Sequence, residues 1–423
     1  MNEAKANRAG ISGNVDLSGK NWDLDTVIDW MIDDGRKCQS LDEFTSGLAR
    51  ALVAADAPIM RLVMTFRTLH PQFSAERVLW ERGKGMISHR RSDHNIWSTD
   101  AYRGSPIETI VTTGKPYHRK LTDLDPDRDH QVLFDLAKAG VTDYYGQIIP
   151  FTFQRQSTFL VNTDVPGGFT ESDIAKFDRL VKHLGPIVEV LVTHTIAVGL
   201  LDTYLGPRTG RKVFAGLIKR GDGEEIDAAL WFSDLREFTH LTEAYTADDV
   251  LDLLNAYFEH VHTAVTAYGG EILRFIGDAM LIVFPVQEGK HPETARRDAC
   301  RAALDAAVDA FSSLAVMNSL RRRDKKPETR FGVGLHFGHV VYGNVGAPGR
   351  LDFTVMGPAV NRTSRLESLT KELGIPLLLS EEMGRIADVP VTPRGKHAMK
   401  GVAEPQSVVS YNAFDEEFGF AAK

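Results

Sequence analysis

Two short stretches, each placing one aspartate at the end of an apolar run, constrain the fold of this chain more than any other feature. Ile226–Phe232 is typical of a buried strand, and Asp234 follows where that run ends. Ile272–Phe275 and Met280–Phe284 are two further strand-like runs, and Gly277–Asp278 between them is typical of a hairpin tip. Either aspartate alone would be an ordinary turn residue. Two carboxylates on the ends of neighbouring strands, however, could share hard cations such as Mg²⁺, and a two-metal site suits in-line displacement at phosphorus.

Four segments, in order, resemble the motifs of class III nucleotidyl cyclases. Trp231–Thr239 resembles the first metal motif of that family, and Gly269–Asp278 resembles the second. Leu351–Arg365 is similar to the segment that carries base-selecting and transition-state residues, and Met399–Gly401 is similar to the late phosphate-binding lysine motif. The likeness covers roughly Glu225–Tyr411, and four ordered motifs are far more specific than one short pattern. The resemblance implies a ferredoxin-like α+β catalytic domain.

The resemblance also implies a metal site and a catalytic pair. Asp234 and Asp278 would bind two Mg²⁺ or Mn²⁺ ions, and the backbone carbonyl of Leu235 would add a ligand. Asn361 would orient the ribose, and Arg365 would stabilise charge on the α-phosphate. Because these last two residues are four apart, they project from one helical face, as such a pair of roles requires.

Three more residues are implied to bind substrate. Lys400 would hold the terminal phosphates. Thr354 stands at the second base-selecting position, and the threonine subgroup, which this chain resembles, makes cyclic AMP. Arg274 replaces the usual lysine that contacts the adenine ring, and its forked, bulkier guanidinium leaves the preference between ATP and GTP open.

The implied activity is that of a phosphorus–oxygen lyase, an adenylate cyclase that converts ATP to 3′,5′-cyclic AMP and pyrophosphate without a side-chain nucleophile. In the family, the metal aspartates come from one subunit and the helix pair from the other. This chain carries every element, so a homodimer with sites between its chains is expected.

Three alternatives stand beside this interpretation. A guanylate cyclase is the nearest, because Arg274 is atypical. A catalytically weak cyclase-like module for binding and dimerisation is the second, because Glu237 replaces the glycine common in the first motif and adds a Cβ where the backbone needs freedom. A diguanylate synthase would need its own glycine-glycine-acidic-acidic-phenylalanine signature, which this sequence lacks.

The chain is expected to contain four regions. Residues 1–20 are small, polar and aperiodic, which predicts disorder. Residues 21–170 alternate between helix and strand patterns, and Tyr144–Asp173 is similar to the last part of GAF domains, so an α+β GAF-like sensor or dimerisation domain with an unknown effector is expected. Residues 171–224 would form a long helix and linker, and residues 225–415 the cyclase domain.

The long helix is predicted to have two roles. Thr170–Asp173 forms a capping box at its start, and Gly185–Pro186 should kink it. Its first half is expected to pack on its own domain, and its second half to form a parallel two-chain coil in which His194, the single polar member of the seam, fixes the register. The apolar seam follows spacings of three and four: Phe177, Leu180, Leu184, Ile187, Leu191, His194, Val198, Leu201 and Leu205.

Four further elements are expected in the cyclase region. Pro292–Leu320 and Gly357–Gly374 have helical patterns, the first followed by a basic, solvated loop, Arg321–Lys326. Phe331–Gly338 and Val340–Val345 are expected to form a hairpin of two apolar strands.

Charge and cysteine content bear on location and partners. The net charge is 49 − 57 = −8, which argues against general attraction to nucleic acid or anionic lipid. Cys38 and Cys300 are far apart and fit a reducing compartment. Ile187–Leu201, the most apolar stretch, contains Glu189 and His194 and is too short to span a bilayer. The sequence therefore predicts a cytoplasmic protein without a membrane span or a nucleic-acid partner.

Overall fold

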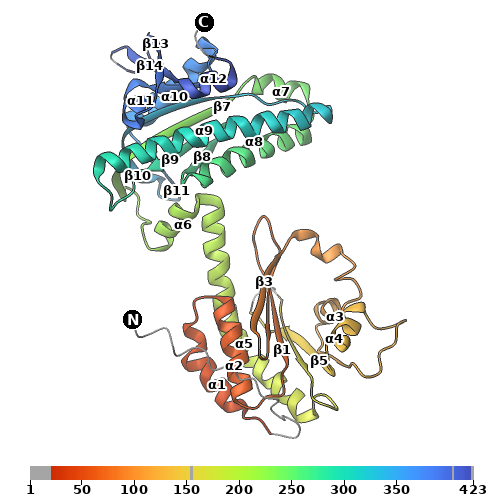
Figure 1. Ribbon diagram of the computed structural model, residues 1–423. Coiled ribbons are helices and arrows are strands. Elements are labelled where there is room, and N and C mark those ends of the chain that lie inside the picture. Colours follow the sequence, from red (N-terminus) through yellow and green to blue (C-terminus); the bar gives the residue numbers. More distant parts are fainter. Residues whose placement is uncertain (1–20, 153–155, 403, 421–423) are drawn as a thin grey trace. The chain divides into compact units, whose positions relative to one another are not determined.

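The structure, a computed structural model, describes residues 21–152, 156–402 and 404–420, so the disorder predicted for residues 1–20 lies outside the described residues. The chain divides into two compact units, Met1–Thr203 and Tyr204–Lys423, and each is described by itself. Both units combine helices with an extended sheet (Figure 1), which confirms the predicted α+β class.

The N-terminal unit is built on a six-stranded sheet with the order β3-β2-β1-β6-β5-β4, in which every neighbouring pair is antiparallel. Helices α1, α2 and α5 cover one face, and α3 and α4 cover the other (Figure 1). Its elements are α1 (Leu24–Asp33), a 3₁₀ turn (Gly35–Lys37), α2 (Leu41–Ala54), β1 (Arg61–Arg67), β2 (Ala75–Glu81), β3 (Gly85–Ser92), a 3₁₀ turn (His94–Ser98), α3 (Pro106–Thr113), β4 (Tyr117–Lys120), α4 (Gln131–Lys138), β5 (Asp143–Ile149), β6 (Ser157–Thr163) and α5 (Glu171–Leu205).

The alternation of side chains along β1 explains this layering. Leu62, Met64 and Phe66 are buried against α1, α2 and α5, whereas Val63 is buried against α3 and α4. Strands β3 and β4 were not expected from the sequence, because their side chains are mostly exposed and polar and show no apolar run. The likeness of this unit to GAF domains stays a prediction.

Helix α5 begins at the predicted capping box. The Asp173 amide donates to Thr170 Oγ1 at 3.2 Å, and the Thr170 amide donates back to Asp173 Oδ2 at 2.9 Å. The helix runs through Pro186 without a break, and its first half is buried in the core of its own unit, as predicted, at positions from Phe177 to Val188; Val192 and Ile196 of its second half are buried in the same core.

The second half of α5 leaves more surface uncovered. Leu191, Val198 and Leu201 are only half-buried, and Val190 is 68% exposed. By length and composition the whole helix could cross a membrane, whereas the sequence predicts that Ile187–Leu201 alone is too short to do so. One third of the most apolar window of the helix is buried, and core helices of soluble proteins have the same length and composition. The two-chain coil therefore stays a prediction.

The C-terminal unit contains the order β7-α8-β8-β9-α9-β10, and these strands lie in the sheet order β10-β7-β9-β8. This βαββαβ arrangement confirms the ferredoxin-like prediction. Strands β12, β14 and β13 extend the sheet beyond β10. The elements are α6 (Pro207–Phe214), β7 (Gly223–Leu235), α7 (Phe238–Ala244), α8 (Ala247–Ala267), β8 (Glu271–Ile276), β9 (Ala279–Pro285), α9 (Pro292–Arg323), β10 (Phe331–Ala347), β11 (Arg350–Met356), α10 (Pro358–Leu373), β12 (Leu377–Ser380), α11 (Glu381–Ala387), β13 (Val391–His397), β14 (Gln406–Tyr411) and α12 (Asn412–Phe418).

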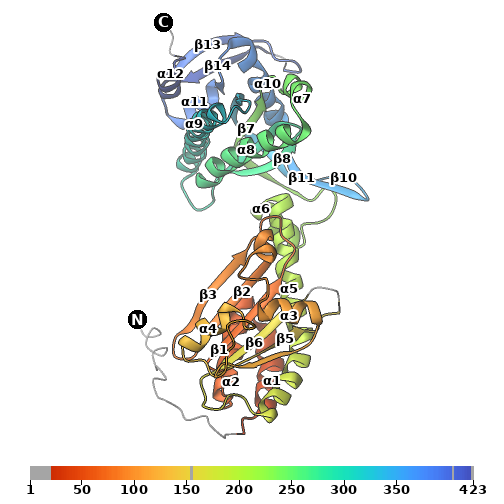
Figure 2. The same ribbon diagram turned by 90° about the vertical axis from the view of Figure 1, so that its right-hand side faces the viewer.

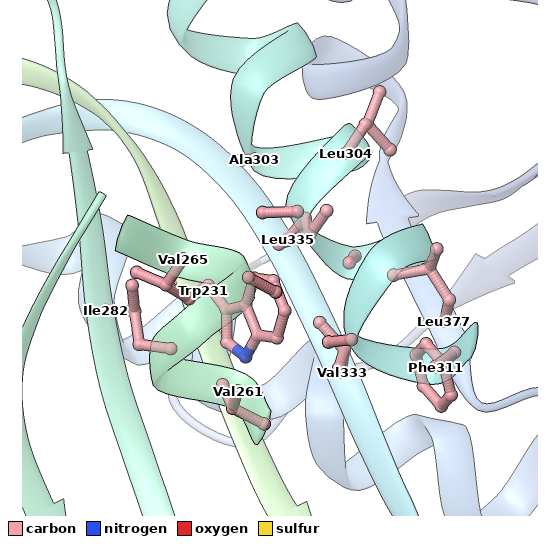
Figure 3. Close-up of a cluster of buried hydrophobic side chains, with 14 of the residues drawn as sticks. Trp231, Val261, Val265, Ile282, Ala303, Leu304, Phe311, Val333, Leu335 and Leu377 are labelled. Carbon is pink, nitrogen blue, oxygen red and sulfur yellow. The ribbon is translucent and has the colours of Figure 1, made fainter. Parts of the chain in front are cut away.

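The core of this unit lies between the sheet and helices α8 and α9. Figure 3 shows Trp231 of β7 beside Val261 and Val265 of α8, with Ile282 and Leu335 from the neighbouring strands, and all five side chains are buried. Leu230, the residue before Trp231, belongs to a second cluster on the opposite face of the sheet. This alternation fixes the direction in which the residues at the end of β7 point.

Two sequence-based expectations for this unit are wrong. The predicted hairpin of Phe331–Gly338 and Val340–Val345 is one continuous strand, β10, because Gly338 pairs with Ala228 of β7 within the ladder. The true hairpin joins β10 to β11 and extends past the rest of the sheet (Figure 2). The basic segment predicted as a solvated loop is helical up to Arg323, since α9 extends that far.

Arg321, the first residue of that basic segment, is buried. Its Nη1 lies 3.1 Å from Asp252 Oδ2, and its Nε donates to the carbonyl of Pro327 at 2.7 Å. These partners offset part of the cost of burying the charge, which is why Arg321 can be buried in the last turn of the helix.

Helix α10 forms where it was predicted, between Gly357 and Gly374. It rests directly on β10, because a Cβ at Gly334 would lie 2.6 Å from the Thr363 carbonyl and 2.5 Å from the Glu367 amide. A glycine at this point of the strand therefore permits the close approach that positions the helix.

Candidate active site

The two predicted metal aspartates lie at one edge of the central sheet. Asp234 is the penultimate residue of β7, and Asp278 lies in the turn between β8 and β9, where Gly277 has a φ of +66°. Strand β7 pairs with β9, and the register sets Ser233 opposite Met280, so Asp234 lies level with the turn that holds Asp278. The structure thus brings together the two side chains that the sequence predicted as neighbours.

The two carboxylates are close enough to perturb each other. Burial, and after it the negative charge of Asp234, together raise the pKa of Asp278 from its ordinary 3.8 to about 6. A proton is thereby stabilised on Asp278 because two bare carboxylates at one place repel. A bound cation would relieve the same repulsion.

Lys371, at the C-terminal end of α10, places a positive charge beside the two carboxylates. Its Nζ lies 2.9 Å from Asp234 Oδ2, and its charge lowers the pKa of Asp278 in opposition to the larger effects of burial and Asp234. The side chain of Lys371 is 48% exposed, so the pair is an accessible one that other groups can displace.

The donor set fits hard divalent cations. Two aspartate carboxylates converge, with oxygen ligands of the kind that Mg²⁺ and Mn²⁺ prefer. In the described part of the chain, no group of three or more histidine, cysteine, aspartate and glutamate side chains could hold a metal, so other ligands would have to come from backbone, substrate or water. The side chain of Leu235 is buried in the core, and the role of its backbone carbonyl as a metal ligand stays a prediction.

A second charged pair lies beside the aspartates and was not predicted. Arg236, two residues after Asp234, lies 3.1 Å from Glu367 Oε1 on α10 and also donates to Thr370 Oγ1. Burial raises the pKa of Glu367 to about 7 even though the charge of Arg236 acts to lower it. This pair fixes α10 against the end of β7.

Glu237, which replaces the usual glycine of the first motif, has the backbone strain that the sequence suggested. Its φ is +58°, in the left-handed region that favours glycine. Its carboxylate is 2.9 Å from Arg330 Nη2, and both side chains are largely exposed. The positive φ keeps the ground for the alternative of a catalytically weak module, whereas the carboxylate itself is engaged by Arg330.

The two predicted base-selecting residues lie near each other on adjacent parts of the sheet. Thr354 is buried on β11 opposite Gly343, and Arg274 lies on β8. Arg274 Nη2 is 2.6 Å from Asp352 Oδ2, two residues before Thr354. Asp352 therefore orients the guanidinium, a contact that the sequence gave no reason to expect.

The remaining predicted residues belong to a different region of the unit. Asn361 is exposed near the start of α10 and lines a groove of about 670 Å³ together with Met356 and Gly401. Lys400 is exposed in the turn beside Gly401, and Arg365 lies half-buried one helical turn after Asn361. The described lining of this groove includes neither metal aspartate.

Within a single chain, the predicted site residues therefore lie in two separate places. One contains the aspartates and Lys371, and the other contains the Asn361 groove and Lys400. The residues that the sequence analysis missed, Lys371, Glu367 and Asp352, act through contacts with residues far away in the chain, so no local pattern marks them.

Comparison with known proteins identifies the C-terminal unit. Residues 224–412 match the family described as the adenylate and guanylate cyclase catalytic domain. Adenylate cyclase 1 of Rhizobium meliloti is 36% identical over 151 residues, which cover 35% of this chain and 22% of that protein. The adenylate cyclase of Anabaena cylindrica is 33% identical over 159 residues, which cover 38% of this chain and 30% of that protein.

The matched segments thus span less than a third of the length of these relatives. Among solved structures, the adenylyl cyclase CyaB of P. aeruginosa is 27% identical with a TM-score of 0.40, and the match covers 45% of this chain and 95% of that one. Residues 224–412, which hold the ferredoxin-like sheet and the ordered motifs, are thus similar to the adenylate and guanylate cyclase catalytic domain.

Proposed function

We propose that this protein is an adenylate cyclase that converts ATP to 3′,5′-cyclic AMP and pyrophosphate by two-metal catalysis between the chains of a homodimer. The observation that carries the proposal is the convergence of Asp234 and Asp278 at the ends of adjoining strands, where the charge of Asp234 raises the pKa of Asp278. The names of the relatives, which are adenylate cyclases, support the same choice.

The geometry of α10 supports a site shared between chains. Lys371 near the end of this helix contacts Asp234, whereas Asn361, ten residues earlier, lines the separate groove. Ten residues of helix span about 15 Å. One substrate at Asp234 is therefore not also positioned by Asn361 of the same chain, and a second copy would supply the missing half.

The proposed chemistry requires charge stabilisation rather than a side-chain nucleophile. The 3′-oxygen of ATP forms a bond to the α-phosphorus, the bond from that phosphorus to the β-phosphate oxygen breaks, pyrophosphate leaves, and the hydroxyl proton is lost to water. Metal ions, when bound, lower the pKa of the hydroxyl and neutralise the phosphates. Asp234 and Asp278 hold those ions, Asn361 positions the ribose, and Arg365 and Lys400 offset the developing negative charge.

The choice of base depends on Thr354 and Arg274. Thr354 serves the exocyclic amine of adenine, and Arg274, held by Asp352, donates to a ring nitrogen. Guanylate cyclase is the second candidate, because an arginine can also donate to the guanine oxygen. We expect Arg274→Lys to keep or improve the preference for ATP, and loss of Thr354 to weaken it.

We also propose that the N-terminal unit regulates the catalytic unit, with an effector still to be identified, and that helix α5 connects the two. Burial of the first half of α5 in the N-terminal core supports this, because a change in that core would reach the helix directly.

The test is to incubate the purified protein with ATP or GTP and with Mg²⁺ or Mn²⁺, and to identify the product by mass. Cyclic AMP formed faster than cyclic GMP supports the proposal, and faster turnover of GTP replaces it with the second candidate. Asp278→Ala is the control, because product formed at the wild-type rate by this variant would exclude the proposed metal site.

A further inference from the structure

A large cavity in the C-terminal unit lies beside the candidate active site. It has a volume of about 710 Å³ and is bounded by α9, the end of α10, the start of β10 and α12. Cavities of 300–1,000 Å³ are typical of small-molecule sites. We call this cavity the phenylalanine pocket, after the five phenylalanines in its lining: Phe311, Phe331, Phe414, Phe418 and Phe420.

The wall of the pocket is aromatic and well ordered by its own contacts. Phe311 and Phe331 stack with ring centroids 4.3 Å apart, and Phe414 contacts Phe311 at 4.9 Å and Phe418 at 4.6 Å. Figure 3 shows Phe311 at the border of the buried cluster around Val333 and Leu377. Apolar carbon placed against this wall would be removed from water, which favours binding by about 25 cal/mol per Å² of apolar area.

The polar side chains of the lining carry more positive than negative charge. Arg236, Arg330 and Lys371 are cationic, and Glu237 is the carboxylate in the same lining. The side chain of Arg330 is 74% exposed and that of Lys371 is 48% exposed, so both can turn toward a ligand. Each of these cations has a carboxylate partner, Glu367, Glu237 or Asp234, so an anionic ligand would compete with those partners.

One buried hydroxyl in the lining also lacks a partner. Thr329 is 1% exposed, and its Oγ1 makes no hydrogen bond to any residue that the structure describes. Its backbone is held by Asn318, whose Oδ1 accepts from the Thr329 amide at 2.8 Å and whose Nδ2 donates to the Thr329 carbonyl at 2.7 Å. An unsatisfied buried hydroxyl is unfavourable, so a ligand that supplied an acceptor would recover that loss.

We infer that the phenylalanine pocket binds an amphipathic anion, with an apolar body against the aromatic wall and a carboxylate head among Arg330, Lys371 and Thr329. The pocket would be a site distinct from the ATP site, because its described lining includes neither metal aspartate and neither Asn361 nor Lys400.

Lys371 gives this pocket a direct connection to the candidate metal site. The same side chain lines the pocket and contacts Asp234 at 2.9 Å. An anion that attracts Lys371 weakens its contact with Asp234 and frees that carboxylate for a cation. The bound anion therefore raises the affinity for divalent metal, and by linkage the metal raises the affinity for the anion by the same factor. This coupling rests on the proposed metal site, whereas binding of the anion does not.

The binding step is tested by calorimetric titration of the full chain with decanoate, and with decanol as the uncharged probe. Ala315→Trp adds bulk to the pocket from an exposed position, and Val316→Trp is the matched control, because Val316 is 64% exposed on the same helix outside the lining. We expect decanoate to bind the wild type, Ala315→Trp to weaken binding at least tenfold, and Val316→Trp to change it less than twofold.

The charge of the head group is tested separately. Arg330→Gln should weaken decanoate binding by about tenfold and leave decanol binding unchanged, while Arg322→Gln, an exposed arginine outside the lining, should change neither. The proposal is overturned if decanoate shows no saturable binding, or if both Ala315→Trp and Arg330→Gln bind it as tightly as the wild type. Arg330 is exposed, so the second variant remains informative even if the tryptophan disturbs folding.

The coupling step is tested by measuring Mn²⁺ binding with and without decanoate, from the electron paramagnetic resonance signal of the free ion. We expect about three- to tenfold tighter binding of Mn²⁺ with decanoate, and no such gain in Lys371→Met. Unchanged Mn²⁺ affinity in the wild type would refute the coupling. Failure of Mn²⁺ to bind at all, together with normal decanoate binding, would instead refute the proposed metal site and leave the pocket standing.

Discussion

Glu237 adopts a left-handed backbone conformation, and replacing it should change stability in an order that contacts alone do not predict. Its φ is +58°, and its carboxylate pairs with Arg330 at 2.9 Å. Glycine, asparagine and alanine all remove that ion pair, but they differ in how well they tolerate a positive φ. We therefore expect Glu237→Gly to be the most stable of the three variants, Glu237→Asn intermediate and Glu237→Ala the least stable.

The magnitude follows from two opposing effects. A left-handed conformation costs a residue with a Cβ about 1–2 kcal/mol, which glycine avoids. Glycine also gains freedom in the unfolded chain, which lowers its advantage by about 0.4–1 kcal/mol. The ion pair itself contributes at most about 1 kcal/mol, since the two side chains are 71% and 74% exposed. Glu237→Gly should thus exceed Glu237→Ala by about 1 kcal/mol, or about 2–4 °C in the unfolding midpoint of a unit of this size.

Differential scanning calorimetry of the three variants measures this order. The comparison between glycine and alanine is independent of the lost ion pair, because both lack it, and Arg330→Gln reports the value of that pair alone. Equal midpoints for Glu237→Gly and Glu237→Ala would show that the backbone at this position is not strained and would refute the reasoning.

Three further predictions concern the proposed enzyme. Mixing inactive Asp278→Ala with inactive Arg365→Ala should restore about a quarter of the sites if the two chains pair at random, and proven heterodimers without activity would contradict a shared site. Inserting one residue after Val198 rotates the rest of helix α5 by about 100° and should change activity while folding is retained; unchanged activity, dimerisation and regulation would refute the linker role. Because the pKa of Asp278 is about 6 and a proton competes with metal for its carboxylate, Mn²⁺ affinity should fall by up to tenfold per pH unit below about pH 6, whereas an ordinary aspartate would hold it constant to about pH 4.

The sequence predicted best those parts of the site that depend on local pattern. Asp234, the turn at Asp278 and helix α10 are each determined by apolar periodicity and by turn residues within a few positions. The same patterns gave a wrong prediction at Gly338, where a turn between two strands was expected. A Cβ there would lie 2.5 Å from that of Ala359, so this glycine serves the close approach of α10 and not a turn.

The contacts that could not be predicted are those between side chains distant in sequence. Arg321 was placed in a solvated loop because basic runs are usually exposed, yet Asp252, 69 residues earlier, makes its burial possible. Lys371 likewise had no distinguishing pattern, and its importance depends on Asp234, 137 residues earlier. Which charges meet is decided by the packing of α8, α9 and α10 on the sheet, and a single sequence does not encode that packing in any local spacing.

Glu237 also connects the strained backbone to the phenylalanine pocket, and the connection yields a final prediction. Its carboxylate lines that pocket and engages Arg330, the cation proposed to receive the head group of the ligand. Removing the carboxylate eliminates an internal competitor, so Glu237→Gly and Glu237→Ala should both bind decanoate about three- to tenfold more tightly than the wild type. Stability should separate the two variants while decanoate affinity should not, because the first depends on φ and the second on charge. Calorimetric titration measures the affinities, and an affinity that followed the unfolding midpoint instead would mean that the pocket responds to backbone strain rather than to competition for Arg330.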